Sequence, residues 1–145
     1  MKSSSKESSP ALRQTIASRL EETESVCMKI RDVLQANDLG EVCFGVELLA
    51  RECLNNAVIH GNRKDADNSI RVCLWLGRKW IRLEVSDEGP GFDWRGTRQK
   101  RMDTGASSGR GLHLYALYAE RVRFNRRGNR ITLWIGRNNR MGKES

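Results

Sequence analysis

A long amphipathic segment followed directly by two alternating segments constrains the fold of this chain most. Between Leu39 and His60, apolar residues recur at the spacing of one helix face. The segments 69–76 and 80–86 instead alternate apolar with polar residues, as strands with one buried face do, and residues 77–79 form a turn between them. The chain is therefore expected to combine helices and strands. The apolar residues of the helix are Val42, Val46, Leu49, Cys53, Leu54 and Ala57.

A strand and a helix are predicted ahead of this segment. Residues 11–17 fit a short strand, and apolar residues at helical spacing predict a helix that ends at about Gln35. Ser18 and Glu21 have the spacing of a capping box, in which the two side chains bond to the first free N–H groups of a helix. We therefore expect this pair to mark the start of the first helix.

The rest of the chain continues the succession of helices and strands. Asp38 and Glu41 repeat the capping-box spacing and are expected to open the second helix. Near the C-terminus, a helix at 111–119 is predicted to lead into a hairpin of strands at 122–125 and 131–135, which turns at Gly128-Asn129.

The length and the ends of the chain predict one cytoplasmic domain. The 145 residues suit a single core, which we place at 11–136. Residues 1–10 are rich in serine and lysine and are predicted to be a flexible lead-in, and 137–145 a polar tail. No apolar run approaches the roughly 20 residues that cross a bilayer, and the first residues lack the pattern of a signal peptide. We therefore expect no membrane association.

The four cysteines are predicted to be core residues rather than metal ligands. Cys27, Cys43, Cys53 and Cys73 form no C-x-x-C pair, and the chain has only two histidines. A structural zinc site needs four clustered nitrogen or sulfur ligands, which this spacing does not offer. Each cysteine falls in an apolar stretch, where a free thiol acts as a small hydrophobe.

The net charge of +8 allows several kinds of partner. Nucleic-acid-binding proteins are often this basic, because binding to phosphates releases counterions. The basic residues are enriched at 95–101 and 121–140, but no helix-turn-helix, zinc-finger or aromatic RNA-binding motif accompanies them. Direct nucleic-acid binding is therefore not expected. An acidic protein partner or the phosphates of a nucleotide would suit the charge equally well.

Three short motifs carry the candidate chemistry: RECLNNAVIHGN at 51–62, DEGPGFD at 87–93 and SGRGL at 108–112. In the second motif Asp87 ends a buried strand, and Gly89 and Gly91 allow a flat ligand to approach the backbone. The carboxylate could accept a hydrogen bond from an exocyclic amine such as that of adenine. In the third motif Gly109 and Gly111 precede a helix, whose N-terminus can cradle a phosphate.

The first motif supplies a row of polar side chains on the second helix. Glu52, Asn56 and His60 follow one another at i, i+4 and i+8, about one turn apart. The amide oxygen of Asn56 is a hard ligand suited to Mg²⁺ beside phosphates, and Glu52 could orient or deprotonate a nucleophile. Each part alone has an ordinary structural explanation. Together the motifs supply the parts that phosphoryl transfer needs.

These three motifs, in this order, resemble the N box and the two glycine boxes of the ATPase superfamily of gyrase and the histidine kinases (GHKL). The resemblance covers about 13–135 and implies an α/β (α+β) two-layer sandwich of the Bergerat ATP-binding type. In that fold helices cover one face of a mixed, largely antiparallel sheet. Glu52 then takes the place of the general base, Asn56 that of the Mg²⁺ ligand and Asp87 that of the adenine-reading carboxylate. The other candidate nucleotide-binding residues are His60, Gly89, Gly91, Gly109, Arg110 and Gly111, and 92–108 takes the place of the ATP lid.

More narrowly, the chain is similar to the bacterial anti-sigma-factor serine kinases of the partner-switching type. It shows no dimerisation helix with a phosphoacceptor histidine ahead of the N box, and no large transducer domain. The resemblance implies ATP and Mg²⁺ as cofactors, a homodimer, a serine substrate on an antagonist protein of the STAS fold, and sequestration of a sigma factor. The alternative is a non-catalytic ATP-binding switch that binds a protein partner.

Two features depart from the pattern of these kinases. The family often has a threonine in the last hairpin that holds adenine through water, whereas Asn129 and Arg130 occupy that neighbourhood here and Thr132 follows. No role is assigned to these residues. The predicted lid is also strongly basic and could grip phosphates or an acidic partner, although a solvated loop is the simpler interpretation. Its basic residues are Arg95, Arg98, Lys100 and Arg101.

Overall fold

The computed structural model describes residues 9–63, 65–91 and 110–138. Its centre is a five-stranded sheet with the strand order β1-β2-β3-β5-β4, and all four pairings are antiparallel. Apolar and polar residues alternate along these strands, so one face is buried while the other keeps its polar side chains. The strands are β1 (Leu12–Ala17), β2 (Ser69–Leu76), β3 (Trp80–Asp87), β4 (Arg121–Phe124) and β5 (Arg130–Gly136).

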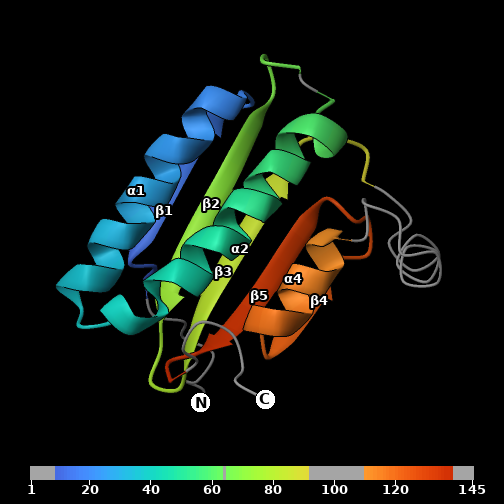
Figure 1. The fold of residues 1–145 in the computed structure, drawn as a ribbon. Helices are drawn as coiled ribbons and strands as arrows, with labels where there is room; N and C mark the ends of the chain where they lie inside the picture. Colours follow the sequence, from blue (N-terminus) through green and yellow to red (C-terminus); the bar gives the residue numbers. More distant parts are fainter. Residues whose placement is uncertain (1–8, 64, 92–109, 139–145) are drawn as a thin grey trace.

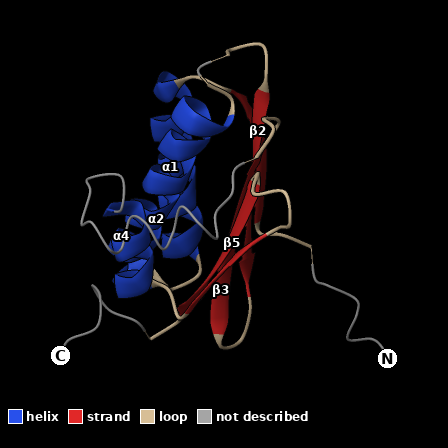
Figure 2. Ribbon diagram, turned by 90° about the vertical axis from the view of Figure 1, so that its right-hand side faces the viewer, coloured by secondary structure: helices blue, strands red, loops and turns tan. Residues whose placement is uncertain are grey.

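The helices form a second layer on one face of this sheet (Figure 1). In the view of Figure 2 the sheet is seen nearly edge-on, and α1, α2 and α4 all lie on the same side of it. The sequence prediction of a two-layer α+β sandwich is thus confirmed, with a purely antiparallel sheet among the described strands. The helices are α1 (Leu20–Ala36), α2 (Cys43–Asn56) and α4 (Arg110–Tyr118), with a short 3₁₀ turn η2 (Gly40–Val42) and a π turn η3 (Ala57–Gly61) at the two ends of α2.

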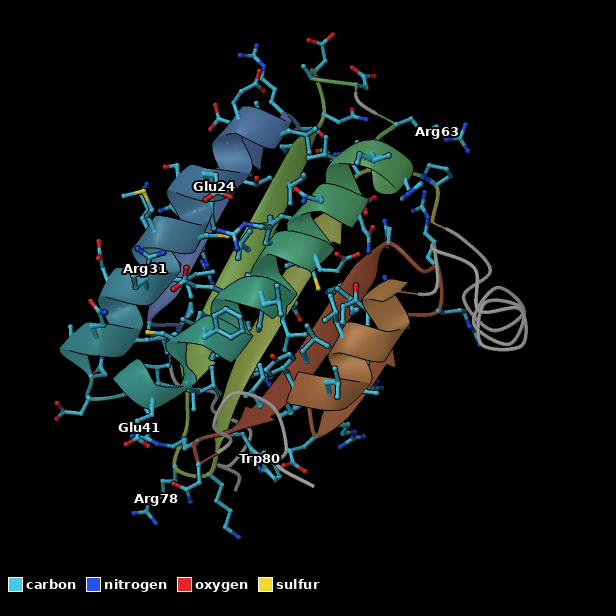
Figure 3. All side chains as sticks on the ribbon, viewed as in Figure 1. Glu24, Arg31, Glu41, Arg63, Arg78 and Trp80 are labelled. Atoms are coloured by element: carbon cyan, nitrogen blue, oxygen red, sulfur yellow. The ribbon has the colours of Figure 1, made fainter. Side chains whose placement is uncertain are left out.

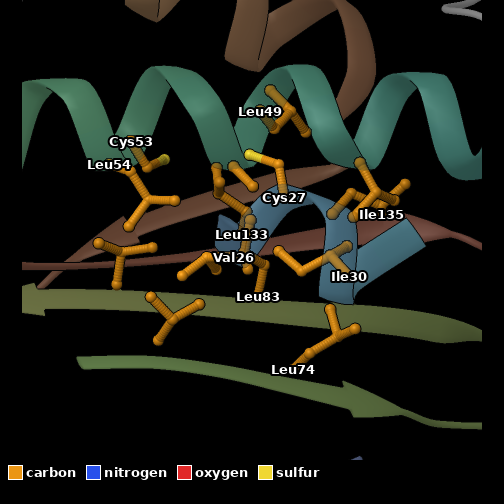
Figure 4. Packing of buried hydrophobic residues seen from close by; sticks show 14 of the residues in the cluster. Val26, Cys27, Ile30, Leu49, Cys53, Leu54, Leu74, Leu83, Leu133 and Ile135 are labelled. Atoms are coloured by element: carbon orange, nitrogen blue, oxygen red, sulfur yellow. The ribbon is translucent and has the colours of Figure 1, made fainter. Parts of the chain in front are cut away.

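The core fills the space between the helices and the inner face of the sheet (Figure 4). Leu74, Leu83 and Leu133 lie side by side on β2, β3 and β5 and are fully buried. Burying a leucine or isoleucine side chain contributes about 1.5–3 kcal/mol. Side chains of the two long helices pack against this row, among them Val26, Cys27, Ile30, Leu49, Cys53 and Leu54.

The four cysteines are free and buried. Cys27, Cys43 and Cys53 belong to the core between the helices and the sheet, as predicted, whereas Cys73 lies on the opposite face of the sheet, in register with Arg13 and Glu84. Burial raises the pKa of the Cys27 thiol to about 11 and that of Cys53 to about 12, because the interior disfavours a thiolate. These thiols therefore stay protonated and unreactive at neutral pH.

Two ion pairs connect α1 with α2, the helix that carries the N-box residues, and Figure 3 labels their α1 members, Glu24 and Arg31. Arg31 donates two hydrogen bonds of 2.8 Å to the carboxylate of Glu47, and Arg51 donates bonds of 2.7 and 2.9 Å to that of Glu24. Both pairs are partly exposed, so each is expected to contribute no more than about 1 kcal/mol. Their fork geometry fixes the register of the two helices more than it stabilises them.

Neither predicted capping box forms. Ser18 is buried at the end of β1, where its N–H donates to Asn68, and the residue at the N-cap position of α1 is Arg19, which makes no side-chain cap. Asp38 has a left-handed backbone with φ of 60°. This conformation ends α1, because it lets the N–H of Leu39 bond back to the carbonyl of Leu34 at 2.8 Å. Asp38 therefore ends the first helix instead of starting the second.

The predicted single helix at 39–60 is divided into three parts. It opens with the η2 turn, runs as an α-helix from Cys43 to Asn56, and closes with the wider η3 turn. Glu52 and Asn56 of the predicted polar row lie in the α-helix, one turn apart. His60, the third residue of that row, lies in the π turn, where the α-helical spacing no longer applies. Among the described helices, none has the length and apolar character to cross a bilayer.

Candidate functional site

Asp87 ends β3 on the face of the sheet that the helices cover. It lies opposite Ile70 in the register of β2 and β3, and Ile70 is fully buried under the helix layer. The η3 turn at the end of α2 packs against this end of β3. A Cβ atom at Gly61 would overlap the carboxylate of Asp87, so only a glycine lets the helix end come this close. The first and second motifs therefore meet at Gly61 and Asp87.

The loop after β3 touches the same helix end. A Cβ atom at Gly89 would overlap the carbonyl oxygen of Gly61, which is backbone and cannot move aside easily. Gly91 has a positive φ of 87° and packs against the backbone of Arg127 in the last hairpin. The two glycines of the second motif are thus required by close backbone contacts on two different sides.

The carboxylate of Asp87 is held in one orientation. Its Oδ1 accepts a hydrogen bond of 2.8 Å from the N–H of Gly89, two residues further on. Burial raises the pKa of Asp87, while this hydrogen bond and the Arg127 guanidinium act in the opposite direction. A half-buried carboxylate with one oxygen fixed by the backbone can accept a hydrogen bond from a ligand amine with its other oxygen.

Two asparagines that sequence reasoning did not assign hold this loop in place. The side chain of Asn129 donates through Nδ2 to the backbone carbonyl oxygens of Asp87 and Gly89, both at 3.3 Å. The backbone carbonyl of Asn129 also accepts a hydrogen bond of 2.9 Å from the backbone N–H of Asp87. Asn62 is buried and accepts the N–H of Glu88 at 3.0 Å. In the sequence, Asn62 was only the last residue of the first motif, and Asn129 was a turn residue of the last hairpin to which no role was assigned.

Glu52 and Asn56 lie next to each other on the last turns of α2. Nδ2 of Asn56 donates to Oε2 of Glu52 and to the hydroxyl of Tyr115, both at 3.3 Å. The amide oxygen of Asn56 is thereby turned away from these two partners, and both Glu52 and Asn56 are half-buried. The predicted general base and the predicted metal ligand are therefore in direct contact.

Tyr115 connects this pair to α4, whose first turn carries the end of the third motif. Its side chain is buried, and burial raises the pKa of its hydroxyl well above the ordinary value. The hydroxyl also accepts a hydrogen bond from the thiol of Cys53 at 3.6 Å. Sequence reasoning missed this residue, because nothing in the sequence distinguishes it from Tyr118, the second tyrosine of the same helix.

The structure describes some of the remaining candidate nucleotide-binding residues and not others. His60 lies in the η3 turn and is exposed. Arg110 and Gly111 form the first residues of α4, so the predicted helix start is present at that position. Gly109 and the predicted lid at 92–108 lie outside the described residues.

Comparison with known proteins gives one match. The family described as histidine kinase-like ATPase domain matches residues 16–135, which includes all three motifs and the five strands, apart from the first residues of β1 and the last residue of β5. No curated protein shows significant similarity to the chain. The match spans most of the chain, and the antiparallel sheet with its helix layer is consistent with this family. The chain therefore belongs to the histidine kinase-like ATPase domain family and contains an ATP-binding domain of that family.

Proposed function

We propose that this protein is an ATP-dependent protein serine kinase that also acts as an anti-sigma factor. The observation that carries the proposal is the contact of 3.3 Å between Glu52 and Asn56, on the helix that ends against Asp87. A domain that only bound ATP would need the carboxylate of Asp87 and a phosphate-binding helix end. A carboxylate fixed beside a metal ligand is additionally suited to transfer.

The nucleotide-binding roles follow from the placement of each element. Asp87 would accept a hydrogen bond from the adenine amine, and Gly89 and Gly91 would shape the base slot by letting the loop after β3 pack closely against Gly61 and Arg127. Arg110 and Gly111, in the first turn of α4, would face the phosphates with free N–H groups and the positive end of the helix dipole. Tyr115, further along α4, would keep this helix in register with Asn56.

The donor set at Asn56 fits Mg²⁺. This ion prefers oxygen ligands and is commonly held by one or two protein groups together with substrate phosphates and water. The amide nitrogen of Asn56 is engaged by Glu52 and Tyr115, which leaves the amide oxygen directed elsewhere. When bound, Mg²⁺ would neutralise charge on the phosphate oxygens.

Glu52 would act on the hydroxyl of the substrate serine. As the serine oxygen attacks the γ-phosphorus of ATP, its proton passes to the Glu52 carboxylate, and the bond to the β-γ bridging oxygen breaks to release ADP. The hydrogen bond from Asn56 orients the carboxylate for this task. Positioning of this kind accounts for most of the catalysis in phosphoryl transfer.

The partners proposed for this activity are proteins. The substrate serine would lie on an antagonist of the STAS fold, and a sigma factor would bind in the alternative state. We further propose that the protein works in the cytoplasm and as a homodimer. The support for this narrower function is the resemblance of the motifs to the partner-switching kinases.

Glu52→Gln is expected to lower the phosphotransfer rate by about 10²–10⁴-fold, because the amide cannot accept the serine proton. ATP affinity should stay within about threefold of wild type, since the amide keeps the hydrogen-bond contact with Asn56. The rate is measured with radiolabelled ATP and purified STAS-domain antagonists, and the affinity by calorimetry.

Asn56→Ala provides the contrasting variant. It should weaken ATP binding in the presence of Mg²⁺ and have a much smaller effect in EDTA, because it removes the metal ligand rather than the base.

Transfer at the wild-type rate by Glu52→Gln would contradict the assignment of the base. If wild type binds ATP but phosphorylates no antagonist, the protein is a nucleotide-dependent switch instead.

A further inference from the structure

The face of the sheet opposite the helices is strongly basic. Strand register places six arginines on this face, against one acidic residue, Glu84, among the described strand residues. The described helices all lie on the other side of the sheet (Figure 2). We call this surface the basic face; its arginines are Arg13, Arg71, Arg82, Arg121, Arg123 and Arg130.

Tryptophans alternate with arginines in one row across the basic face. Trp75, Arg82, Trp134 and Arg121 are successive partners on β2, β3, β5 and β4. The guanidinium carbon of Arg82 lies 4.0 Å from the ring centre of Trp75, and that of Arg121 lies 5.0 Å from the ring centre of Trp134. Stacking on an indole holds a guanidinium in a defined position while its N–H groups remain able to bind an anion.

A groove of about 460 Å³ lies on the same face, over β3, β5 and β4. Four arginines line it together with the carboxylate of Glu84: Arg82, Arg123, Arg126 and Arg130. It lies on the other side of the sheet from Asp87, whose side chain shares the helix-covered face with Ile70. The groove is therefore separate from the nucleotide site and has room for a few side chains of a partner.

We propose that the basic face is a docking surface for an acidic segment of a partner polypeptide. Clustered guanidinium groups bind carboxylates through paired hydrogen bonds, and complementary charge raises both the rate and the selectivity of association. Tryptophan and arginine are also the residues that most often dominate the energy of protein interfaces. The proposal holds whether or not the domain transfers phosphate.

The alternative occupants fit the same surface less well. A single-stranded nucleic acid would need indole faces on which its bases can stack, but guanidinium groups already cover a face of Trp75 and of Trp134. A second copy of the chain, placed face to face, would bring two sets of arginines together with only one glutamate each to oppose them. An acidic polypeptide requires neither free rings nor self-complementary charge.

The test compares two double variants of the full chain that lose the same charge. Arg123→Ala with Arg130→Ala removes two exposed arginines from the basic face, and Arg19→Ala with Arg78→Ala removes two exposed arginines elsewhere. Binding of a short fluorescein-labelled peptide rich in glutamate and aspartate is followed by anisotropy. Circular dichroism checks that both variants remain folded.

We expect the first pair to weaken peptide binding by about tenfold or more and the second pair by less than about twofold. Equal losses would show that net charge alone attracts the peptide and would overturn the proposal. Tighter binding of an oligodeoxythymidine of equal charge would assign the face to nucleic acid. A wild-type dimer that only the first pair dissociates would assign it to a second copy.

Discussion

Asp87→Asn is expected to weaken ATP binding by about a hundredfold or more. The substitution replaces one carboxylate oxygen with an NH₂ group. That group would either oppose the adenine amine, which is also a donor, or face the N–H of Gly89 and break its contact with the side chain. Losing a charge-assisted hydrogen bond and creating an unsatisfied donor together cost about 3 kcal/mol, which corresponds to about two powers of ten. Isothermal titration calorimetry measures the change.

The matched control for this variant lies on the same strand. Glu84→Gln also converts a carboxylate of β3 into an amide, but Glu84 belongs to the opposite face of the sheet. It should bind ATP with wild-type affinity. Similar losses in both variants would mean that the charge of the strand, and not the Asp87 carboxylate itself, supports nucleotide binding.

Gly89→Ala is expected to have the largest effect on the folded structure. The added methyl group would occupy the position of the Gly61 carbonyl, so the loop after β3 and the end of α2 must separate. Overpacking against backbone costs about 3 kcal/mol or more in unfolding free energy, and the displaced loop would no longer hold Asp87. Urea denaturation measures the stability, and ATP titration at low temperature measures the binding.

Gly40→Ala serves as the control for this second variant. A Cβ atom at Gly40 meets no other atom within 4 Å, so the same chemical change should alter the unfolding free energy by less than about 1 kcal/mol. If Gly89→Ala were as stable as Gly40→Ala and bound ATP normally, the close contact between the two motifs would not be needed for the site.

The strands and helices could be predicted because their periodicity is a local property of the sequence. The segments 69–76 and 131–135 show the alternation that the sheet buries on one face, and both lie within observed strands. The helix ends were predicted less well. Ser18 and Asp38 have the chemistry of caps, but tertiary contacts bury the first and a left-handed backbone changes the function of the second.

The candidate site residues could be named from the sequence only because three motifs occur together. Asp87 and Asn56 each have an ordinary structural explanation when taken alone, as a turn residue and a polar helix residue. Asn129 could not be found in this way, because it acts on Asp87 across 42 positions of sequence. Its effect depends on the pairing of β3 with β5, which the sequence does not state.

The position of the positive charge on the surface could not be predicted from the sequence either. The arginines are spread along the chain, with enrichment at 95–101 and 121–140, so the sequence alone did not assign them to one surface. Strand register then brings Arg82, Arg123 and Arg130 to one side of the sheet. The partners that this surface can bind follow from the register and not from the net charge of +8.

The central claim is that Asp87 reads an adenine base at the junction of three distant motifs, and it is tested most directly by calorimetry with two nucleotides. The wild-type chain is titrated with Mg-ATP and with Mg-GTP under the same conditions. We predict binding of one ATP per chain and at least about a hundredfold weaker binding of GTP, whose exocyclic carbonyl oxygen would face the carboxylate in place of an amine. Equal affinities for the two nucleotides, or no heat with ATP, would contradict the claim.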